Sequence, residues 1–313
     1  MELTAFFERQ LGVWDEARRR YEQLGDVQVK HLDVDGVPVS VQYNPARIVS
    51  TGARIDARSL ARRKCFLCPE QRPAEQISLT FADRYEVLVN PFPILPRHFT
   101  VPLRQHAPQS LAAHYPDLLR LVEGQQDYFV FYNGPRCGAS APDHMHFQMG
   151  LRGRVPLERD WARRYAAACQ LLCETDGGRL YVLRTYVVPL FAIVTRTVAD
   201  SERLFRRLHD QLPQDEASGE PMMNVLAWHT TGETTEAEHY VSLVIPRGKH
   251  RPDCYGKPDG EGFMVSPGAL DMGGLVITPR GEDFDRIGPV DVKKILKEVA
   301  LSDAQVERTC RKL

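Results

Sequence analysis

The sequence predicts an α+β fold, because strand-like segments and amphipathic helical segments both recur along the chain. The strand-like segments alternate apolar and polar residues or are apolar throughout, and turn residues bound them. They are residues 27–44, with a hairpin turn at Asp35-Gly36, residues 85–106, which contain two strands broken by prolines, and residues 128–133. The helical segments have apolar residues at a period near 3.6. They are residues 2–23, a segment that begins at an N-cap Ser110, residues 157–174 and residues 200–211.

Composition places the chain among ordinary globular proteins. Hydrophobic residues make up 43% of the 313 residues, charged residues 26%, and the net charge is −1, so no nucleic acid and no membrane is expected as a partner. The most apolar run, residues 180–194, contains Arg184 and Pro189 and is too short to span a bilayer. The N-terminus has helical periodicity instead of a signal-peptide pattern, which favours a cytosolic, cytoplasmic protein.

Two halves are expected. The polar segment 213–221, "PQDEASGEP", is the best candidate for an internal linker. Segments 99–108 and 242–252 each contain an apolar run and a proline followed by Arg and then His, which suggests a degenerate internal repeat. The predicted division is therefore residues 1–212, with the chemistry, and residues 213–313, a degenerate second half that ends in one or two amphipathic helices. A homodimer is compatible with this organisation.

The stretch "DHMHFQM" has a pattern typical of a strand with two different faces. Side chains at alternate positions share a face, so His144, His146 and Gln148 lie together, and the intervening Met145 and Phe147 lie on the opposite face. The apolar face predicts core, and the polar face predicts a site. The alternative is a half-exposed strand whose polar face is only solvated.

A metal site is the preferred interpretation of "KCFLCP". Cys65 and Cys68 are spaced to present two thiolates to one tetrahedral ion, and zinc prefers four sulfur or nitrogen ligands. No second C-x-x-C motif occurs, so two further ligands must come from elsewhere, and histidine is the usual supplier. The seven cysteines are an odd number, which argues against a disulfide framework. A redox dithiol is the rival interpretation, although Pro69 follows the second cysteine and does not suit that motif.

The segment "NGPRCGAS", Asn133 to Ser140, is a candidate phosphate loop. Its glycines permit close approach of the backbone, and consecutive amides with a serine hydroxyl form an anion-binding nest. Such strings are more often plain turns, so the interest of this one is that it ends four residues before His144.

Together, "NPFPILPRHFTVPLRQH" (90–106), "NGPRCGAS" and "HMHFQ" resemble the histidine-triad superfamily. Gln148 in the last triad position resembles its nucleotidyltransferase and phosphorylase branch: galactose-1-phosphate uridylyltransferase, diadenosine tetraphosphate phosphorylase and GDP-L-galactose phosphorylase. "CFLCP" resembles the zinc motif of the uridylyltransferases, "YNPAR" (43–47) their nucleotide-binding segment, and the segment 266–284 the distal part of GDP-L-galactose phosphorylase. The resemblance implies a histidine-triad-like (HIT-like) antiparallel sheet with flanking helices, in two halves of which the second is degenerate.

The resemblance also implies roles for individual residues. Cys65, Cys68, His106 and His144 would bind a structural Zn²⁺, His146 would be the nucleophile, and Gln148 would donate a hydrogen bond to the transferring phosphoryl group. Asn133, Gly138 and Ser140 would line the phosphate pocket, with Arg136 as an added candidate from the same loop. His98 matches a conserved position of the family, although Arg97 precedes it where glycine is usual. Arg62, Arg63, Lys64 and the cluster Lys249, His250 and Arg251 are more often solvated surface.

These roles predict a ping-pong enzyme. A neutral imidazole attacks the α-phosphorus of a nucleotide, and the nucleotidyl-histidine then passes to an acceptor. Glutamine cannot exchange a proton at neutral pH, so Gln148 favours transfer to phosphate or a sugar 1-phosphate over hydrolysis. The expected donor is an NDP-sugar, and a dinucleoside polyphosphate is the runner-up. The alternatives from other classes are a non-catalytic zinc-stabilised nucleotide-binding protein and a thiol redox protein.

Overall fold

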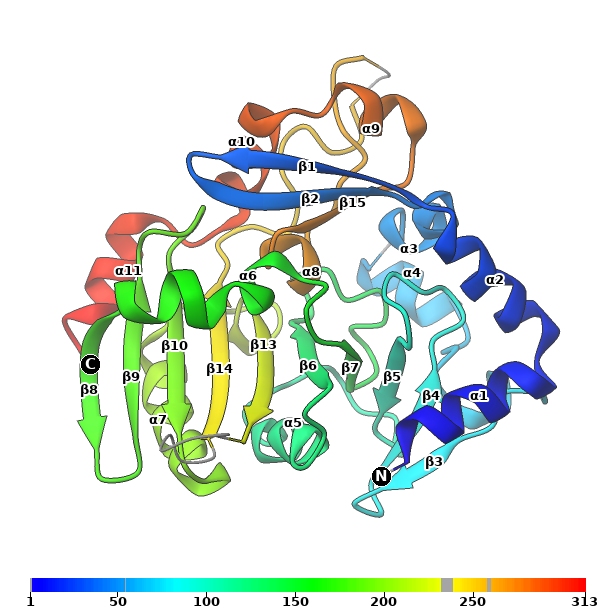
Figure 1. The fold of residues 1–313 in the computed structure, drawn as a ribbon, viewed down its shortest axis with the longest axis horizontal. Helices are drawn as coiled ribbons and strands as arrows, with labels where there is room; N and C mark the ends of the chain where they lie inside the picture. The colour runs from blue at the N-terminus through cyan, green and yellow to red at the C-terminus, as the bar shows by residue number, and fades with distance from the viewer. Residues whose placement is uncertain (1, 54, 232–238, 258–259) are drawn as a thin grey trace.

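The computed structural model describes residues 2–53, 55–231, 239–257 and 260–313, and its main feature is a ten-stranded sheet (Figure 1). The strand order is β3-β4-β5-β7-β6-β13-β14-β10-β9-β8, and neighbouring strands are antiparallel throughout. The strands are β3 (Leu79–Phe81), β4 (Tyr85–Val89), β5 (Phe99–Pro102), β6 (Tyr128–Asn133), β7 (His146–Leu151), β8 (Gln170–Thr175), β9 (Gly178–Leu183), β10 (Leu190–Thr195), β13 (Met223–Thr230) and β14 (His239–Pro246). The predicted α+β class with an antiparallel sheet is confirmed.

The sheet consists of two five-stranded halves with the same topology. In the first half, β3, β4 and β5 precede helix α5 (Tyr115–Val122), and β6 and β7 follow it. In the second half, β8, β9 and β10 precede helix α7 (Val198–Gln211), and β13 and β14 follow it. The two halves meet where β6 pairs with β13, from Asn133 opposite Asn224 to Phe129 opposite Trp228. The predicted duplication is therefore present in the topology.

The details of that duplication differ from the sequence-based expectation. Residues 170–211 lie in the second half of the sheet, although the division at 212 and 213 assigns them to the first, so we propose a boundary near residue 170. The expected repeat compared a segment containing β5 with one containing β14, whereas β5 corresponds to β10 by topology. The expected linker 213–221 instead contains the hairpin of β11 (Gln214–Asp215) and β12 (Glu220–Pro221).

Helices cover one face of the large sheet. Core side chains of α5, α7 and α1 (Leu3–Val13) pack with the side chains that β5, β6, β7, β13 and β14 turn to that face. Tyr115 of α5 stacks on Phe205 of α7 with ring centroids 3.9 Å apart, which joins the equivalent helices of the two halves. Met145, Phe147 and Met149 all lie in this core, as their alternation with His146 and Gln148 predicts.

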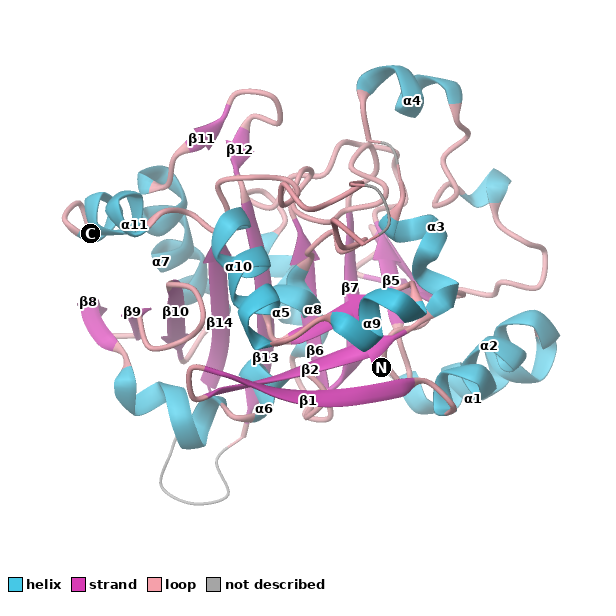
Figure 2. Ribbon diagram, turned by 90° about the horizontal axis from the view of Figure 1, so that it is seen from above, coloured by secondary structure: helices cyan, strands magenta, loops and turns pink. Residues whose placement is uncertain are grey.

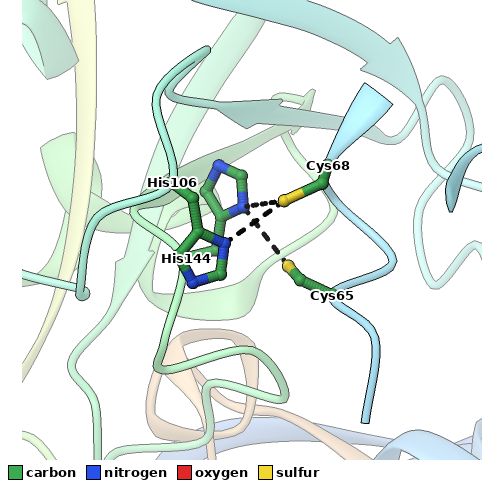
Figure 3. Close-up of side chains that lie close together, drawn as sticks. All are labelled: Cys65, Cys68, His106 and His144. Atoms are coloured by element: carbon green, nitrogen blue, oxygen red, sulfur yellow. Dashed lines mark hydrogen bonds between the residues drawn. The ribbon is translucent and has the colours of Figure 1, made fainter. Parts of the chain in front are cut away.

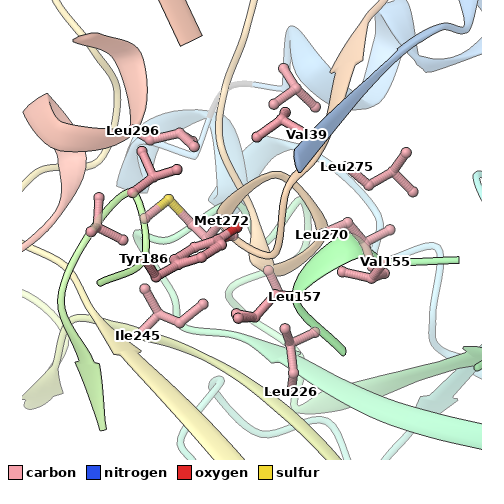
Figure 4. Close-up of a cluster of buried hydrophobic side chains, with 14 of the residues drawn as sticks. Val39, Val155, Leu157, Tyr186, Leu226, Ile245, Leu270, Met272, Leu275 and Leu296 are labelled. Carbon is pink, nitrogen blue, oxygen red and sulfur yellow. The ribbon is translucent and has the colours of Figure 1, made fainter. Parts of the chain in front are cut away.

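A small three-stranded sheet lies over the other face (Figure 2). It consists of β1 (Gln28–Val34), β2 (Val37–Tyr43) and β15 (Leu275–Thr278), and β15 runs parallel to β2. Asp35 and Gly36 form the predicted hairpin turn, and both have positive φ, as a tight hairpin of this kind requires. A second core fills the space between the sheets: Val39 and Leu275 above meet Leu226 and Ile245 below (Figure 4). The helices on this side include α8 (Ala269–Met272), α9 (Gly281–Arg286) and α10 (Pro289–Val299).

Some helix boundaries differ from the sequence prediction. The predicted helix 2–23 is two helices, α1 and α2 (Asp15–Gly25), because the buried Trp14 between them has an extended backbone. Helix α5 begins at Tyr115, five residues after the expected N-cap. Most of segment 157–174 lies outside regular α-helix, and its last residues form β8. The remaining helices are α3 (Ile48–Thr51), α4 (Ala57–Arg62), α6 (Pro156–Arg159) and α11 (Asp303–Cys310), with short helical turns at Pro45–Arg47, Pro69–Gln71, Trp161–Tyr165 and Ala166–Ala168. Within the described ranges, no helix has the length and apolar character needed to cross a bilayer.

Candidate active site

His146 begins β7 and lies on the wall of a cavity between the large sheet and the small one. Its Nδ1–H donates to the carbonyl oxygen of His144 at 2.8 Å, so Nε2 carries the lone pair. The side chain is 4% exposed, and this burial lowers the pKa of His146 to about 4. The imidazole is therefore neutral at neutral pH, which is the state that a nitrogen nucleophile needs.

The side chain of Gln109 fixes the backbone around His146. Its Oε1 accepts a hydrogen bond from the backbone N–H of His146 at 2.8 Å. Its Nε2 donates to the backbone carbonyl oxygens of His146 and Asn133, at 3.0 and 2.9 Å. One buried amide thus joins the start of β7 to the end of β6, and it holds His146 beside the first residue of the predicted phosphate loop.

Gln148 lies on the same wall, and His98 determines which way its amide faces. The backbone N–H of Ile94 donates to Nδ1 of His98 at 3.2 Å, so the proton of the neutral ring is on Nε2. Nε2 then donates to Oε1 of Gln148 at 2.9 Å. Burial lowers the pKa of His98 to about 3, which keeps this ring neutral. The NH₂ group of Gln148 is consequently left to donate to a ligand.

The loop 133–140 contacts the second half of the protein through Asn133 and Gly138, among other residues. Oδ1 of Asn133 accepts from the backbone N–H of Ala269 at 2.7 Å and from Nδ2 of Asn224 at 2.9 Å, so the NH₂ group of Asn133 is its free donor. Gly138 has φ +94°, and a Cβ there would lie 2.5 Å from Cα of Gly268. Both features require glycine at position 138 and press the loop against α8.

Three of the four predicted phosphate-binding residues line the cavity, and the fourth lies outside it. Asn133, Gly138 and Ser140 line the cavity with His146 and Gln148. Arg136 differs from that expectation, because its side chain pairs with Asp215 at 3.0 Å and lies outside the set of residues that line the cavity. A carboxylate from the β11–β12 hairpin therefore neutralises the arginine that the loop sequence favours.

The four predicted metal ligands form one cluster (Figure 3). The ligand atoms of Cys65, Cys68, His106 and His144 all lie within 4.8 Å of one another. Sγ of Cys65 is 3.3 Å from Nδ1 of His144, and Sγ of Cys68 is 3.2 Å from Nδ1 of His106. A tetrahedral ion bound at zinc distances holds such atoms about 3.3–3.8 Å apart, so two thiols and two imidazoles in this arrangement could bind a metal ion.

The surroundings of this cluster support metal binding. Nε2 of His144 donates to the carbonyl oxygen of Leu103 at 2.7 Å, which fixes the ring and leaves Nδ1 free to act as a ligand. Asp143 lies beside the exposed His106 and pairs with Arg63. His144 belongs to the cluster through its ring and holds His146 through its carbonyl, so the metal cluster and the cavity wall share one residue.

The cavity has a volume of about 640 Å³ and an excess of basic side chains on its wall. Arg20, Arg47, Arg63 and Arg251 line it, against the carboxylates of Glu16 and Asp271. Burial lowers the pKa of Arg47 only to about 10, so this guanidinium keeps its charge at neutral pH. A volume of this size accommodates a nucleotide, and the charge excess favours an anionic ligand.

Comparison with known structures identifies the fold. Yeast Ap4A phosphorylase aligns with a TM-score of 0.55 and 16% sequence identity, over 92% of this chain and 96% of that chain. Its complex with Ap4A aligns with a TM-score of 0.54 and the same identity, over 92% and 97%. The chain has the Ap4A phosphorylase fold.

The predicted α+β architecture, a large antiparallel sheet with flanking helices, agrees with this fold. An ADP-glucose phosphorylase from Arabidopsis thaliana aligns with a TM-score of 0.40 and 16% identity, over 88% of this chain and all of that chain. The family model described as a domain of unknown function, DUF4922, matches residues 6–151, a segment that includes the whole metal cluster. No curated protein matches the sequence.

Some residues that form or support the cavity could not be predicted as site residues from the sequence. Gln109 is one of many glutamines, and only its contacts with Asn133 and His146 show that it holds the site together. Arg251 and His250 line the cavity although surface was the more common expectation for them. Their position depends on the contact between the two halves of the sheet, and no local pattern in the sequence reports that contact.

Proposed function

We propose that the protein is a nucleotidyltransferase of the phosphorylase type, with His146 as the nucleophile. The observation that carries the proposal is a buried, neutral His146 whose Nδ1–H is held by the carbonyl of His144 and whose ring lies on the wall of a cavity rich in arginine. A neutral ring fixed in this way presents its Nε2 lone pair to an electrophile.

In the first half-reaction, Nε2 of His146 attacks the α-phosphorus of the donor. The N–P bond forms while the bond from phosphorus to the bridging oxygen breaks, and the leaving group departs with the electron pair as a phosphate ester. In the second half-reaction, an acceptor oxygen attacks the same phosphorus, the N–P bond breaks, and the electron pair returns to Nε2. The proton stays on Nδ1 in both steps, and Nδ1–H keeps its hydrogen bond to the carbonyl oxygen of His144.

Three neutral donors are in place for the charge that develops on the phosphoryl oxygens. Gln148 and Asn133 each have their carbonyl oxygen occupied, which leaves their NH₂ groups as donors. Ser140 adds a hydroxyl on the same wall. Preorganised donors of this kind stabilise a transition state because they need no reorientation during the reaction. None of the three is an acid at neutral pH, which favours transfer to an acceptor over hydrolysis.

For the donor we propose an NDP-sugar, with a dinucleoside polyphosphate as the second candidate. The C-x-x-C cluster favours the first, because it resembles the uridylyltransferase motif. The similarity of fold to yeast Ap4A phosphorylase, including its complex with Ap4A, supports the second. Both donors place an electrophilic α-phosphorus next to further phosphate, and the arginines of the cavity suit either one.

We propose Zn²⁺ as the ion for Cys65, Cys68, His106 and His144. Two thiolates and two imidazoles would fill the four ligand positions of a structural zinc site, so the ion would leave no position for substrate and its contribution would be structural. It would hold His144, whose carbonyl fixes His146. Metal analysis of the purified protein should find one zinc per chain in the wild type and a large loss in Cys68→Ser. A thiol redox protein would contain none.

Intact-mass measurement tests the enzymatic proposal. The protein is incubated with ADP-, GDP-, UDP- and CDP-sugars and with diadenosine polyphosphates, and the quench avoids acid because the phosphoramidate bond is acid-labile. We expect one donor to increase the mass of the wild-type protein by one nucleoside monophosphate, and this increment identifies the base. The same donor should leave the mass of the His146→Ala variant unchanged. His31→Ala is the control, because His31 bonds Ser40 in the small sheet, away from the cavity wall. If no donor labels the wild type, the proposed nucleotidyl-histidine chemistry is contradicted, and the alternative of a non-catalytic nucleotide-binding protein is favoured.

A further inference from the structure

A second imidazole lies on the cavity wall, and burial lowers the pKa of His250 to about 4, so the ring is neutral at neutral pH. Nδ1–H of His250 donates to the backbone carbonyl oxygen of Arg136 at 2.9 Å, so Nε2 carries the lone pair, as in His146. Among the described residues that line the cavity, two side-chain atoms are buried without a hydrogen-bond partner, Nε2 of His250 and Nη1 of Arg63. Nη1 of Arg63 is a donor and suits any anionic oxygen. Nε2 of His250 is an acceptor and suits only a group that has a proton to donate.

Buried Arg247 holds the backbone of His250 in place. The guanidinium of Arg247 donates to the backbone carbonyl oxygens of Lys249 and His250, both at 3.1 Å. It also donates to Oδ1 of Asn224 at 2.7 Å and to the carbonyl oxygen of Pro267 at 2.9 Å. This side chain is 2% exposed, so the segment that presents His250 is anchored to the core of the second half.

These contacts connect His250 to the loop 133–140, whose residues Gly138 and Ser140 line the same cavity. Arg136, its partner, belongs to the loop 133–140, and Asn224 donates to Asn133 at the start of that loop. Gln109 in turn connects the backbone of Asn133 to that of His146. The neighbouring Arg251 also lines the cavity, where its Nε donates to Ser266 at 3.0 Å. A neutral acceptor and a positive charge are therefore fixed at adjacent residues on the cavity wall that the loop 133–140 also lines.

We propose that His250 is a specificity residue for the acceptor, and that its Nε2 accepts a hydrogen bond from the P–OH group of inorganic phosphate. This inference rests on the proposed function. In mildly alkaline solution, phosphate is mainly a dianion that keeps one O–H, whereas sulfate, monofluorophosphate and a sugar 1-phosphate are dianions without a proton on the anionic group. A lone pair facing an unprotonated anionic oxygen is repulsive, so the site selects phosphate.

The step balances with phosphate alone. An unprotonated oxygen of phosphate forms the new P–O bond, the N–P bond to His146 breaks, and its electron pair returns to Nε2. The P–OH proton stays on the phosphate that becomes the β-phosphate of the product, a nucleoside diphosphate. His250 binds this proton without removing it, so no further acid or base takes part. The protein is then a phosphorylase and not a transferase between two sugar phosphates.

The two half-reactions are measured separately. Wild-type protein is first converted to its nucleotidyl form, which intact mass confirms, and the loss of the label is then followed with phosphate, with and without sulfate or monofluorophosphate as competitor. In the wild type, we expect each competitor to bind at least about tenfold more weakly than phosphate, the effect of one hydrogen bond to a charged ligand. His250→Leu should weaken the binding of phosphate by about tenfold and abolish the preference for phosphate over the competitors. His250→Gln should keep most of this preference, because its amide oxygen can accept a hydrogen bond from the same P–OH group.

Lys249→Gln is the matched control, because Lys249 is the adjacent residue and its side chain pairs with Asp253 and Glu298 instead of lining the cavity. Equal affinity of the wild type for phosphate and sulfate, or an unchanged preference in His250→Leu, overturns the inference. The inference also fails if His250→Leu slows only the formation of the nucleotidyl form, because His250 would then contact the donor. Failure of the wild type to become labelled contradicts the proposed function itself, so the two failures are distinguishable.

Discussion

At the scale of single residues, the cavity wall shows how a buried neutral group sets the direction of its neighbour. A glutamine amide can face a ligand with its oxygen or with its nitrogen, and only the nitrogen stabilises a phosphoryl group. The backbone N–H of Ile94 donates to Nδ1 of His98, so the proton of this neutral ring is on Nε2. Nε2–H then donates to the amide oxygen of Gln148, which leaves the amide nitrogen to face the ligand. His98 is therefore a positioning residue that acts through Gln148.

The substitution His98→Phe tests this role. It removes the donor to Gln148, so the amide can turn its oxygen toward the phosphoryl group, and we expect the rate of nucleotidylation to fall by about tenfold to a hundredfold. His98→Gln should recover part of the rate, because its NH₂ group can replace the donor. The decisive measurement is a double-mutant cycle: in a Gln148→Leu background, His98→Phe should cause no further loss. A full additional loss would mean that His98 acts by another route.

At the scale of the elements, a buried carboxylate joins three segments of different origin. Glu220 of β12 accepts a hydrogen bond from the backbone N–H of Leu111 at 2.7 Å, and its other oxygen bonds the hydroxyl of Tyr132 on β6. Burial raises the pKa of Glu220 to about 7. The expected linker between two halves is thus a hairpin fixed to the sheet through one carboxyl group.

This carboxyl group predicts a pH-dependent stability. The folded pKa of about 7 lies above the ordinary value of 4.5, so the folded state binds the proton more tightly. Its stabilisation is complete below about pH 4.5 and is lost as the pH rises through 7, by about 3 kcal/mol in the limit. Glu220→Gln mimics the protonated group, because its amide oxygen can accept from Leu111 while its NH₂ group donates to Tyr132. Urea unfolding should find the variant equal to the wild type at low pH and more stable at high pH, whereas the exposed Glu8→Gln should show no such difference.

The elements also show which parts of the structure the sequence could predict. Strand alternation placed His146 and Gln148 on one face and Phe147 on the other, because a period of two needs no knowledge of distant contacts. The C-x-x-C spacing likewise predicted that Cys65 and Cys68 lie together in a cluster that could bind a metal ion. The break at Trp14 and the start of α5 could not be predicted from periodicity, because tertiary packing decides them.

The remaining misses have a common physical cause. Gln109, His250 and the pairing of Arg136 with Asp215 all depend on contacts between segments far apart in the chain. A local pattern contains the period of an element and the chemistry of a motif. It does not contain the partner that an element meets after folding. The sequence therefore predicted which residues of the first half meet on the cavity wall, and not the way in which the second half completes the cavity.

At the scale of the whole molecule, the two halves form one structure through a shared sheet and shared cores. Every residue of β6 is buried, and its outer edge is covered by β13. Each of the two cores contains side chains from both halves, such as Phe131 with Leu226 in one and Val130 with Val225 in the other. Tyr115 of α5 also donates to Ser242 of β14 at 2.8 Å. The interface between the halves thus contains two apolar cores to which both halves contribute.

This interface predicts that the protein unfolds as one unit. Calorimetry of the full chain should give a single transition in which the calorimetric and van't Hoff enthalpies agree. Residues 1–169 expressed alone would expose the apolar faces and the hydrogen-bonding edge of β6, and such an edge aggregates or stays unfolded. We therefore expect this fragment to lack a cooperative transition by circular dichroism, and co-expression with residues 170–313 to restore it. Two separate transitions in the full chain, or a stable first half, would show that the halves are independent domains.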